Sequence, residues 1–215
     1  MDKQRIISIA GRISSGKDTL AEYLVTQRGF KKLSFAGSLK DSVATVFNWD
    51  RGLLEGTTQE SREWREQVDP WWAKRLALPD LTPRWVLQYI GTEVFRQHFH
   101  QDIWTASLEN KLVTCKDSIV ITDARFQNEL DTVKRVGGTT IRVHRGEEPD
   151  WYSDAVIVNT DPANAEWSNA SARLAQLNIH PSEWSSVGLY YDHHIYNDGT
   201  ITELQQQMAS ILSQE

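Results

Sequence analysis

The sequence predicts an α/β protein with a parallel core sheet and helices on both faces. Short apolar runs, typical of buried strands, alternate with segments whose apolar residues recur at helical spacing. Strands that alternate with helices favour a parallel sheet, because each connecting helix carries the chain back to the edge where it started. The chain of 215 residues is long enough for such a fold. We therefore expect a single domain, 1–215, whose core comprises residues 1–36, 115–145 and 189–215.

The first strand is expected at residues 6–10, an apolar run that Gly11 closes. The helix after it should end near Gly29, since glycine is common just beyond a helix. A last helix is predicted from Thr200 and Glu203, which have the spacing of a capping box. Further strands are expected at residues 32–36 (the weakest candidate), 118–122 and 139–144.

Residues 37–114 are predicted to form a helical insertion within this core, because apolar residues recur there at helical intervals. Within the insertion, Thr82 and Pro83 are typical of an N-cap followed by a first-turn proline, and Gly91 is expected to end that helix. Residues 146–188 are richer in Asp, Asn and Ser, so we expect them to form a surface excursion.

Composition excludes several classes of partner. The formal net charge is −6, so no global positive field favours stable binding to DNA, RNA or an anionic membrane. Cys115 is the only cysteine, which excludes an intrachain disulfide and a thiolate zinc cage and fits a reducing cytoplasm. The apolar stretch after Arg5 is too short for a signal or membrane segment. We expect a cytoplasmic protein with a local anion site, and whether it forms a homodimer stays open.

The local anion site is predicted in the segment from Gly11 to Lys17, which has the G-x-x-x-x-G-K spacing between a strand and a helix. Its glycines let backbone N–H groups converge, and the helix adds the positive end of its dipole. Such a loop binds polyphosphate, with Lys17 reaching between the β- and γ-phosphates of ATP. An incidental glycine turn is the alternative, which the flanking strand and helix disfavour. The predicted nucleotide-binding residues are Gly11, Arg12, Ser14, Ser15, Gly16, Lys17, Asp18 and Thr19.

Three residues are candidate ligands of Mg²⁺. The general motif has Ser or Thr after its lysine, whereas this chain has Asp18 followed by Thr19. Asp18 could hold a magnesium-bound water or cap the helix, and Thr19 could supply the hydroxyl. Asp123 follows a predicted strand at the edge where parallel sheets bind ligands, so it could order magnesium or cap the next helix. Arg125 either contacts the same ligand or pairs with Glu129. Lys17, Asp123 and Arg125 are the predicted catalytic residues.

Several segments also carry a family resemblance. They are Gly16-Lys17-Asp18-Thr19, Leu39-Lys40-Asp41, Leu87-Gln88-Tyr89-Ile90-Gly91-Thr92-Glu93, Trp104, Thr122-Asp123-Ala124-Arg125-Phe126-Gln127-Asn128-Glu129, His180-Pro181-Ser182-Glu183 and Asn197-Asp198-Gly199-Thr200. On these residues the chain resembles the phage-type deoxynucleoside monophosphate kinases over most of its length. The aspartate after the loop lysine is what this family carries. Residues 145–178 match nothing in the resemblance.

The resemblance implies a P-loop NTPase fold with a helical monophosphate-binding insertion and a lid at about 146–188. It implies ATP-dependent, magnesium-dependent phosphorylation of deoxynucleoside monophosphates to diphosphates, which supplies dNTP synthesis. The small-molecule acceptor would then contact Lys40, Arg84, Gly91, Thr92, Trp104, Asp123, Arg125 and Glu129.

Charge and aromatic content add to these expectations. Basic residues of the insertion could clamp the acceptor phosphate as a group, although any one of them is more readily explained as a solvated surface charge. They are Lys40, Arg62, Arg65 and Arg84. Arg142 and Arg145 are expected to be lid arginines that approach the transferring phosphate, with arginines of no catalytic role as the alternative. The chain has nine tryptophans, of which Trp104 is the candidate for stacking on the acceptor base and most others are expected to pack the insertion.

Two alternative functions stay open from the sequence. One keeps a P-loop kinase but changes the acceptor to another small compound or to a modified base in DNA, and the net negative charge argues against the polymer. The other is a non-catalytic nucleotide-binding switch, in which the helical insertion recruits a protein partner. Phosphoryl transfer that depends on the acceptor distinguishes the kinase from the switch.

Overall fold

The computed structural model describes residues 4–177, 179 and 183–214, and it consists of two compact units. Unit 1 comprises Met1–Ser34 and Glu109–Glu215, and unit 2 comprises Phe35–Leu108. The helical insertion expected at 37–114 thus corresponds to unit 2, except that residues 109–114 belong to unit 1.

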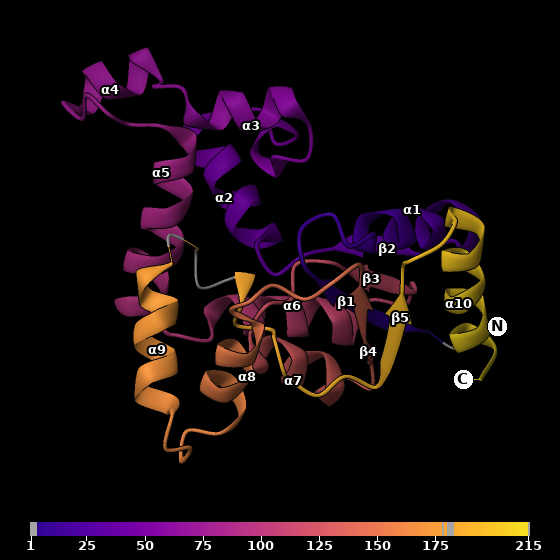
Figure 1. The fold of residues 1–215 in the computed structure, drawn as a ribbon. Coiled ribbons are helices and arrows are strands. Elements are labelled where there is room, and N and C mark those ends of the chain that lie inside the picture. Colours follow the sequence, from indigo (N-terminus) through magenta and orange to yellow (C-terminus); the bar gives the residue numbers. More distant parts are fainter. Residues whose placement is uncertain (1–3, 178, 180–182, 215) are drawn as a thin grey trace. The chain divides into compact units, whose positions relative to one another are not determined.

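Within the described residues, unit 1 contains a five-stranded parallel sheet of order β2-β3-β1-β4-β5 (Figure 1). Its strands are β1 (Ile6–Gly11), β2 (Lys31–Leu33), β3 (Ile119–Ile121), β4 (Thr139–His144) and β5 (His193–Tyr196). In the register, Ser8 of β1 lies opposite Ile121 of β3 and Thr140 of β4. The weakest strand prediction, 32–36, is shifted towards the N-terminus and shortened.

Helices cover both faces of this sheet, as predicted. α1 (Lys17–Arg28) and α10 (Ile201–Gln214) share one hydrophobic cluster with Ile7 and Ile9 of β1. Because side chains alternate along a strand, the next residues of β1 face the other side, where α7 (Gln127–Arg135) packs against β1 and β4 (Figure 1). Unit 1 also contains the C-terminal part of α6 (Ile103–Thr114).

Two of the predicted helix ends are confirmed. α1 ends at Gly29, which adopts a left-handed φ of 71°. At α10, the Glu203 N–H donates to Thr200 Oγ1 at 3.2 Å and the Thr200 N–H donates to Glu203 Oε2 at 2.7 Å, which is the expected capping box.

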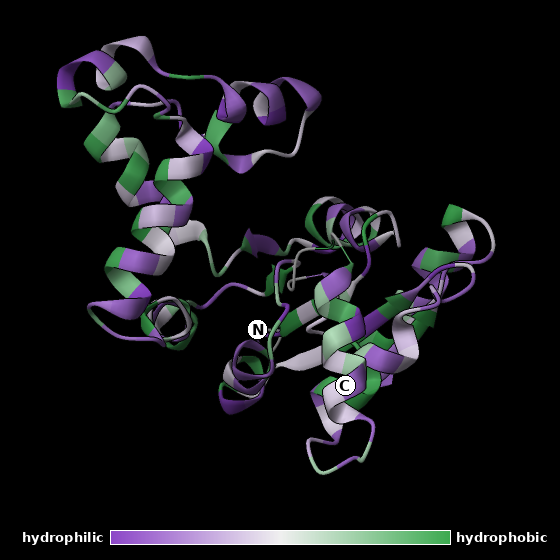
Figure 2. Cartoon of the chain, turned by 60° about the vertical axis from the view of Figure 1, so that its left-hand side comes forward, coloured by the Kyte–Doolittle hydropathy of each residue, from purple (hydrophilic) through white to green (hydrophobic). Residues whose placement is uncertain are grey.

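Unit 2 is helical, and its helices carry both hydrophobic and hydrophilic residues, as expected of helices that pack by one face (Figure 2). Its elements are α2 (Gly37–Phe47), the 3₁₀ turn η1 (Leu53–Glu55), α3 (Gln59–Glu66), α4 (Pro70–Leu76), α5 (Pro83–Gln88) and the π-helix η2 (Tyr89–Gln97). Thr82 caps α5 as predicted, since its hydroxyl accepts the Trp85 N–H at 3.1 Å.

Gly91 does not end a helix, which corrects the prediction. The chain continues through it as η2, and a Cβ at Gly91 would lie 2.7 Å from Leu39 Cδ2. Glycine is needed at this position because two helices approach closely, and a sequence pattern does not distinguish that reason from a helix stop.

The polar segment 146–188 has more structure than the expected surface excursion. It contains α8 (Tyr152–Thr160) and α9 (Trp167–Gln176), with a small core of Ala155, Leu174 and Val187. His180, Pro181 and Ser182, which belong to the family resemblance, lie outside the described residues. Throughout the part of the chain that is described, no helix has the length and apolar character needed to span a bilayer.

Candidate functional site

The segment between β1 and α1 forms a tight loop in unit 1. Ser14 and Gly16 adopt left-handed φ angles of 62° and 102°, and the Ser15 N–H donates to the Arg12 carbonyl at 3.2 Å. This curled backbone is the geometry in which successive N–H groups converge on an anion. A Cβ at Gly16 would lie 2.5 Å from Asn197 Nδ2, so a larger residue does not fit there without movement.

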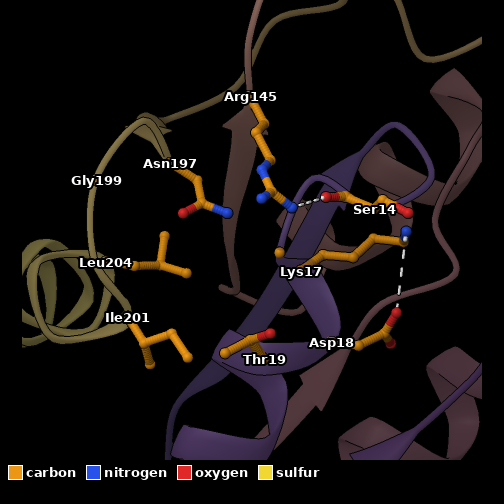
Figure 3. A pocket seen from close by; sticks show the side chains of 10 residues that line it. Ser14, Lys17, Asp18, Thr19, Arg145, Asn197, Gly199, Ile201 and Leu204 are labelled. Carbon is orange, nitrogen blue, oxygen red and sulfur yellow. Dashed lines mark hydrogen bonds and ion pairs between the residues drawn. The ribbon is translucent and has the colours of Figure 1, made fainter.

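A hollow of about 350 Å³ opens beside this loop at the N-terminus of α1 (Figure 3). Its volume lies in the range of small-molecule sites. The residues that line it are Ser14, Gly16, Lys17, Asp18, Thr19, Arg145, Asn197, Gly199, Ile201 and Leu204. They come from the phosphate loop and α1, from the end of β4, and from the β5–α10 connection, so the carboxyl edge of the sheet meets the loop here as expected.

Lys17 is a largely enclosed cation that lines this hollow. Its side chain is only 12% exposed, and Nζ donates to the Arg12 carbonyl at 3.3 Å. Burial is the main cause that lowers the pKa of Lys17, and the nearby cations of Arg125 and Lys32 lower it further, while Asp18 and Glu183 oppose them. A bound phosphate would favour the charged form of this lysine.

The loop also presents an unsatisfied hydroxyl. Ser15 Oγ is buried and has no hydrogen-bond partner among the residues that the structure describes. Buried polar atoms are nearly always hydrogen-bonded. A buried Ser15 hydroxyl without a partner in the loop therefore fits a site in which a bound ligand accepts its hydrogen bond.

Asp18 and Thr19 bring oxygen ligands of the kind that Mg²⁺ prefers to the same hollow. The Asp18 side chain is 70% exposed and accepts from Lys32 Nζ at 3.3 Å. Asp123 lies two residues beyond the end of β3, and its side chain is half-buried. Across residues 4–177, 179 and 183–214, no group of three or more His, Cys, Asp or Glu forms a metal cage.

Glu129 has a structural role that the resemblance does not anticipate. Its side chain is buried, and Oε2 accepts the backbone N–H groups of Arg125 at 2.7 Å and Phe126 at 3.2 Å. Glu129 thus caps α7, and the acceptor contact through this carboxylate stays a prediction. The guanidinium of Arg125 pairs with Glu183 at 3.0 Å. Because Arg125 and Glu183 both affect the pKa of Lys17, the three residues lie close together.

Unit 2 brings three of the predicted arginines together. Burial lowers the pKa of Arg65, and repulsion from Arg84 and Arg62 adds to this effect, while Glu66 and Glu55 oppose it. Arg65 Nε is buried without a partner in the described chain, and its guanidinium lies over Gly56, where a Cβ would be 2.1 Å from Cζ. Arg84 pairs with Glu66 at 3.1 Å, and the positive charges in this cluster outnumber the carboxylates that contact them.

Lys40 is already neutralised by a local ion-pair network. Its Nζ lies 2.6 Å from Glu55 Oε2, and its side chain is only 14% exposed. Arg51 bridges the same glutamate and Asp41, with 2.6 Å to Asp41. Lys40 is therefore a weaker candidate for an acceptor contact than the arginines.

Trp104 lies in the core of unit 2, which contradicts the predicted stacking role. The residue is 6% exposed, its ring packs against Phe95, and Nε1 donates to the Gly91 carbonyl at 2.9 Å. A base needs an open ring face, and this indole presents none. Trp104 and Gly91 together fix η2 to α6, whereas Thr92 is exposed on η2.

The two predicted lid arginines have different environments. Arg145 lines the hollow, and Nη1 donates to the Ser14 carbonyl at 2.9 Å (Figure 3). Arg142 lies within β4 and is 3% exposed, with Nη1 donating to the Ser186 carbonyl at 2.8 Å between the rings of Tyr152 and Tyr191. Arg142 is therefore a buried structural residue, and the prediction of a lid role for it is wrong.

The β5–α10 connection contributes residues that the sequence reasoning did not assign to the site. Asn197 Nδ2 donates to the Ser15 carbonyl at 2.8 Å, and Gly199 and Ile201 line the hollow. Asn197 and Gly199 belong to a turn that carried part of the family resemblance. The position of this turn after a parallel strand was the signal that could have placed it beside the phosphate loop.

Comparison with known proteins identifies the family. The chain is 30% identical over 217 residues to a protein of Acanthamoeba polyphaga mimivirus described provisionally as a deoxynucleotide monophosphate kinase, covering 95% of this chain and 94% of that protein. The chain belongs to the deoxynucleoside monophosphate kinase family. The deoxynucleoside-5'-monophosphate kinase of Escherichia phage T5 is also 30% identical, over 118 residues, or 54% of this chain and 40% of that enzyme. The predicted resemblance is confirmed, and no protein-family model matches the sequence.

Kinases also occur among similar solved structures. Shikimate kinase from Aquifex aeolicus is 12% identical with a TM-score of 0.42, covering 97% of this chain and 96% of that one. Dephospho-CoA kinase from Campylobacter jejuni is 17% identical with a TM-score of 0.41, covering 98% and 97%. These likenesses are too distant to assign a substrate to this member of the deoxynucleoside monophosphate kinase family.

Proposed function

We propose that this chain is a magnesium-dependent kinase that transfers the γ-phosphoryl group of ATP to a deoxynucleoside monophosphate. A phosphate oxygen of the acceptor attacks the γ-phosphorus, the bond to the bridging β-oxygen breaks, and ADP and the deoxynucleoside diphosphate leave. The observation that carries this proposal is the enclosed Lys17 at the phosphate loop in a chain of this family. We place the reaction in the cytoplasm, where it supplies dNTP synthesis.

The donor is proposed to bind in the hollow of unit 1. Its phosphates would accept from the loop N–H groups, from Ser15 Oγ and from Lys17, each of which is a donor of the kind that polyphosphate sites use. The nucleoside would lie along Asn197 and Ile201 at the open end of the hollow. Asp18, Thr19 and Asp123 would hold Mg²⁺, which neutralises phosphate charge.

The acceptor phosphate is proposed to bind the arginine cluster of unit 2, formed by Arg62, Arg65 and Arg84. An excess of guanidinium over carboxylate, together with a buried unpartnered Nε, suits a dianion that accepts two hydrogen bonds from each fork. In unit 1, Arg125 lies near Lys17 and would neutralise charge on the transferring group. A substrate of this size needs no extended basic surface, in keeping with the net charge of −6.

The test is a panel assay of ADP release with ATP, magnesium and each common deoxynucleoside or ribonucleoside monophosphate. Turnover that depends on a deoxynucleoside monophosphate is the expected result. Lys17→Ala should lower kcat by more than about a hundredfold. Lys31→Ala is the matched control, because Lys31 lies on β2 and pairs only on the surface with Asp117. Slow hydrolysis that no acceptor stimulates would instead indicate a nucleotide-binding switch.

A further inference from the structure

Arg12 lies inside the phosphate loop, yet its guanidinium turns to the segment after β4. Nη2 donates to the carbonyl of Arg145 at 3.1 Å and to that of Glu147 at 3.0 Å, and Nε lies 3.7 Å from Glu148 Oε2. Arg145 donates in return to the Ser14 carbonyl of the loop. These reciprocal contacts join the phosphate loop to residues 145–148 from both sides.

Glu148 extends this connection to a pair of histidines. Its Oε1 lies 3.2 Å from His144 Nδ1, and His144 Nε2 lies 2.9 Å from Nδ1 of His194 on β5. The ring of Tyr196 stacks on His144 with centroids 4.9 Å apart. A continuous series of polar contacts therefore runs from β5 to the phosphate loop through His194, His144, Glu148 and Arg12. We call this series the histidine–arginine chain.

The number of protons on the histidine pair is limited by these contacts. The ionised carboxylate of Glu148 can only accept, so His144 Nδ1 carries a proton. The contact between the two rings then holds a single proton, donated either by Nε2 of a charged His144 or by Nδ1 of His194. With a second positive charge, both His144 Nε2 and His194 Nδ1 would carry hydrogens and face each other at 2.9 Å, which would break the hydrogen bond. The hydrogen bond between the two rings therefore forms when the pair carries one positive charge or none.

The groups around His194 favour its neutral form. Partial burial lowers the pKa of His194, and proximity to His144, Arg142 and His193 lowers it further. Glu148 contacts His144 and also pairs with Arg12. Tyr196 and Tyr191 contact the histidine pair through their aromatic rings. These effects favour a neutral His194, with which the histidine–arginine chain is complete.

We propose that four positioning residues hold the phosphate loop in its donor-binding shape, namely Arg12, Glu148, His144 and His194. Double protonation of the histidine pair breaks their contacts and releases the loop from that shape. This rests on the proposed binding of ATP at the loop. None of the four residues needs to touch ATP. Their loss therefore raises the KM for ATP and leaves the acceptor KM unchanged.

The test is a set of pH profiles of kcat and of the two KM values for the full chain. For wild type, the KM for ATP rises as the pH falls below the ordinary range of histidine. His194→Asn keeps a polar group near the Nδ1 position but cannot gain a charge, so this acid rise disappears while KM at neutral pH stays close to wild type. His193→Asn, one residue away on the opposite face of β5, keeps the rise. The protonation of ATP itself is common to all three proteins and cancels in the comparison.

Substitutions at Arg12 provide the second arm. Arg12→Ala raises the KM for ATP about tenfold at every pH, through loss of charge-assisted hydrogen bonds, and Arg12→Lys restores part of the effect. An acid rise that persists in His194→Asn, or an unchanged KM for ATP in Arg12→Ala, would overturn the positioning role.

A third measurement needs no substrate. NMR titration of the ring nitrogens in the unliganded protein should show His144 and His194 titrating as a coupled pair, and independent titration would overturn the inference. Failure of the wild type to bind ATP at neutral pH, with the histidine pair coupled as described, would instead refute the proposed donor site.

Discussion

Replacing Glu129 tests whether this carboxylate caps a helix or binds substrate. Its Oε2 accepts two backbone N–H groups at the start of α7, and the residue is 4% exposed. Hydrogen bonds to a charged group contribute about 1.5–3 kcal/mol each, and a carboxylate near a helix N-terminus adds up to about 1 kcal/mol. Water entering the space left by the side chain recovers part of this. Glu129→Ala should therefore lower the free energy of unfolding by about 3 kcal/mol, and Glu129→Gln, which keeps an acceptor oxygen, by about 1 kcal/mol.

The same substitution has a catalytic consequence. One of the two donors is the backbone N–H of Arg125, so loss of the cap should displace the Arg125 guanidinium from Lys17. A displacement on this scale lowers kcat by roughly tenfold to a hundredfold, with smaller effects on either KM. Urea unfolding followed by circular dichroism gives the stability change, and initial rates give the kinetic constants.

Gln127→Ala is the matched control for Glu129, because Gln127 is exposed in the same turn of α7 and should change stability by less than about 0.5 kcal/mol. A Glu129→Ala protein as stable and active as wild type would refute the capping role. A Glu129→Gln protein with wild-type stability and a strongly raised acceptor KM would show that the carboxylate contacts the substrate after all.

Three further predictions concern the acceptor, the core and acid stability. Arg84→Ala should raise the acceptor KM about tenfold without changing that for ATP, whereas Arg75→Ala, an exposed arginine on α4, should change neither. Trp104→Phe should cost about 2 kcal/mol in urea unfolding, through the lost hydrogen bond and ring volume, and leave the acceptor KM within twofold. Hydrogen bonds from the backbone and hydroxyl of Thr200 hold the pKa of Glu203 below its ordinary value. Its stabilising effect is therefore complete above the ordinary carboxyl pKa and is lost as the pH falls through the lowered value. Glu203→Gln should flatten that part of a thermal stability profile.

The sheet and the phosphate loop could be predicted from the sequence because local patterns specify them. An apolar run such as residues 6–10 is buried on both faces, and glycines at this spacing between a strand and a helix are typical of a loop that binds phosphate. The position of Asp123 after a strand likewise follows from topology alone.

The environments of individual polar and aromatic residues could not be predicted in the same way. Arg142 and Arg145 are three residues apart, yet one is buried between tyrosines and the other lines the hollow. Which side of β4 is covered depends on residues some forty positions later in the chain. Trp104 and Glu129 could not be predicted for the same reason. A motif specifies the type of a side chain, but it does not show whether the polar atoms of that side chain are hydrogen-bonded within the protein.

The bond from the Asn197 side chain to the Ser15 carbonyl spans 182 positions of the chain. During synthesis, the first strand and the loop leave the ribosome long before the turn that contains Asn197. A nascent or truncated polypeptide that stops before this turn has the whole G-x-x-x-x-G-K motif but lacks the amide that holds the motif's backbone. Competence to bind the donor should therefore appear late in translation, when the final strand and helix have folded onto the sheet.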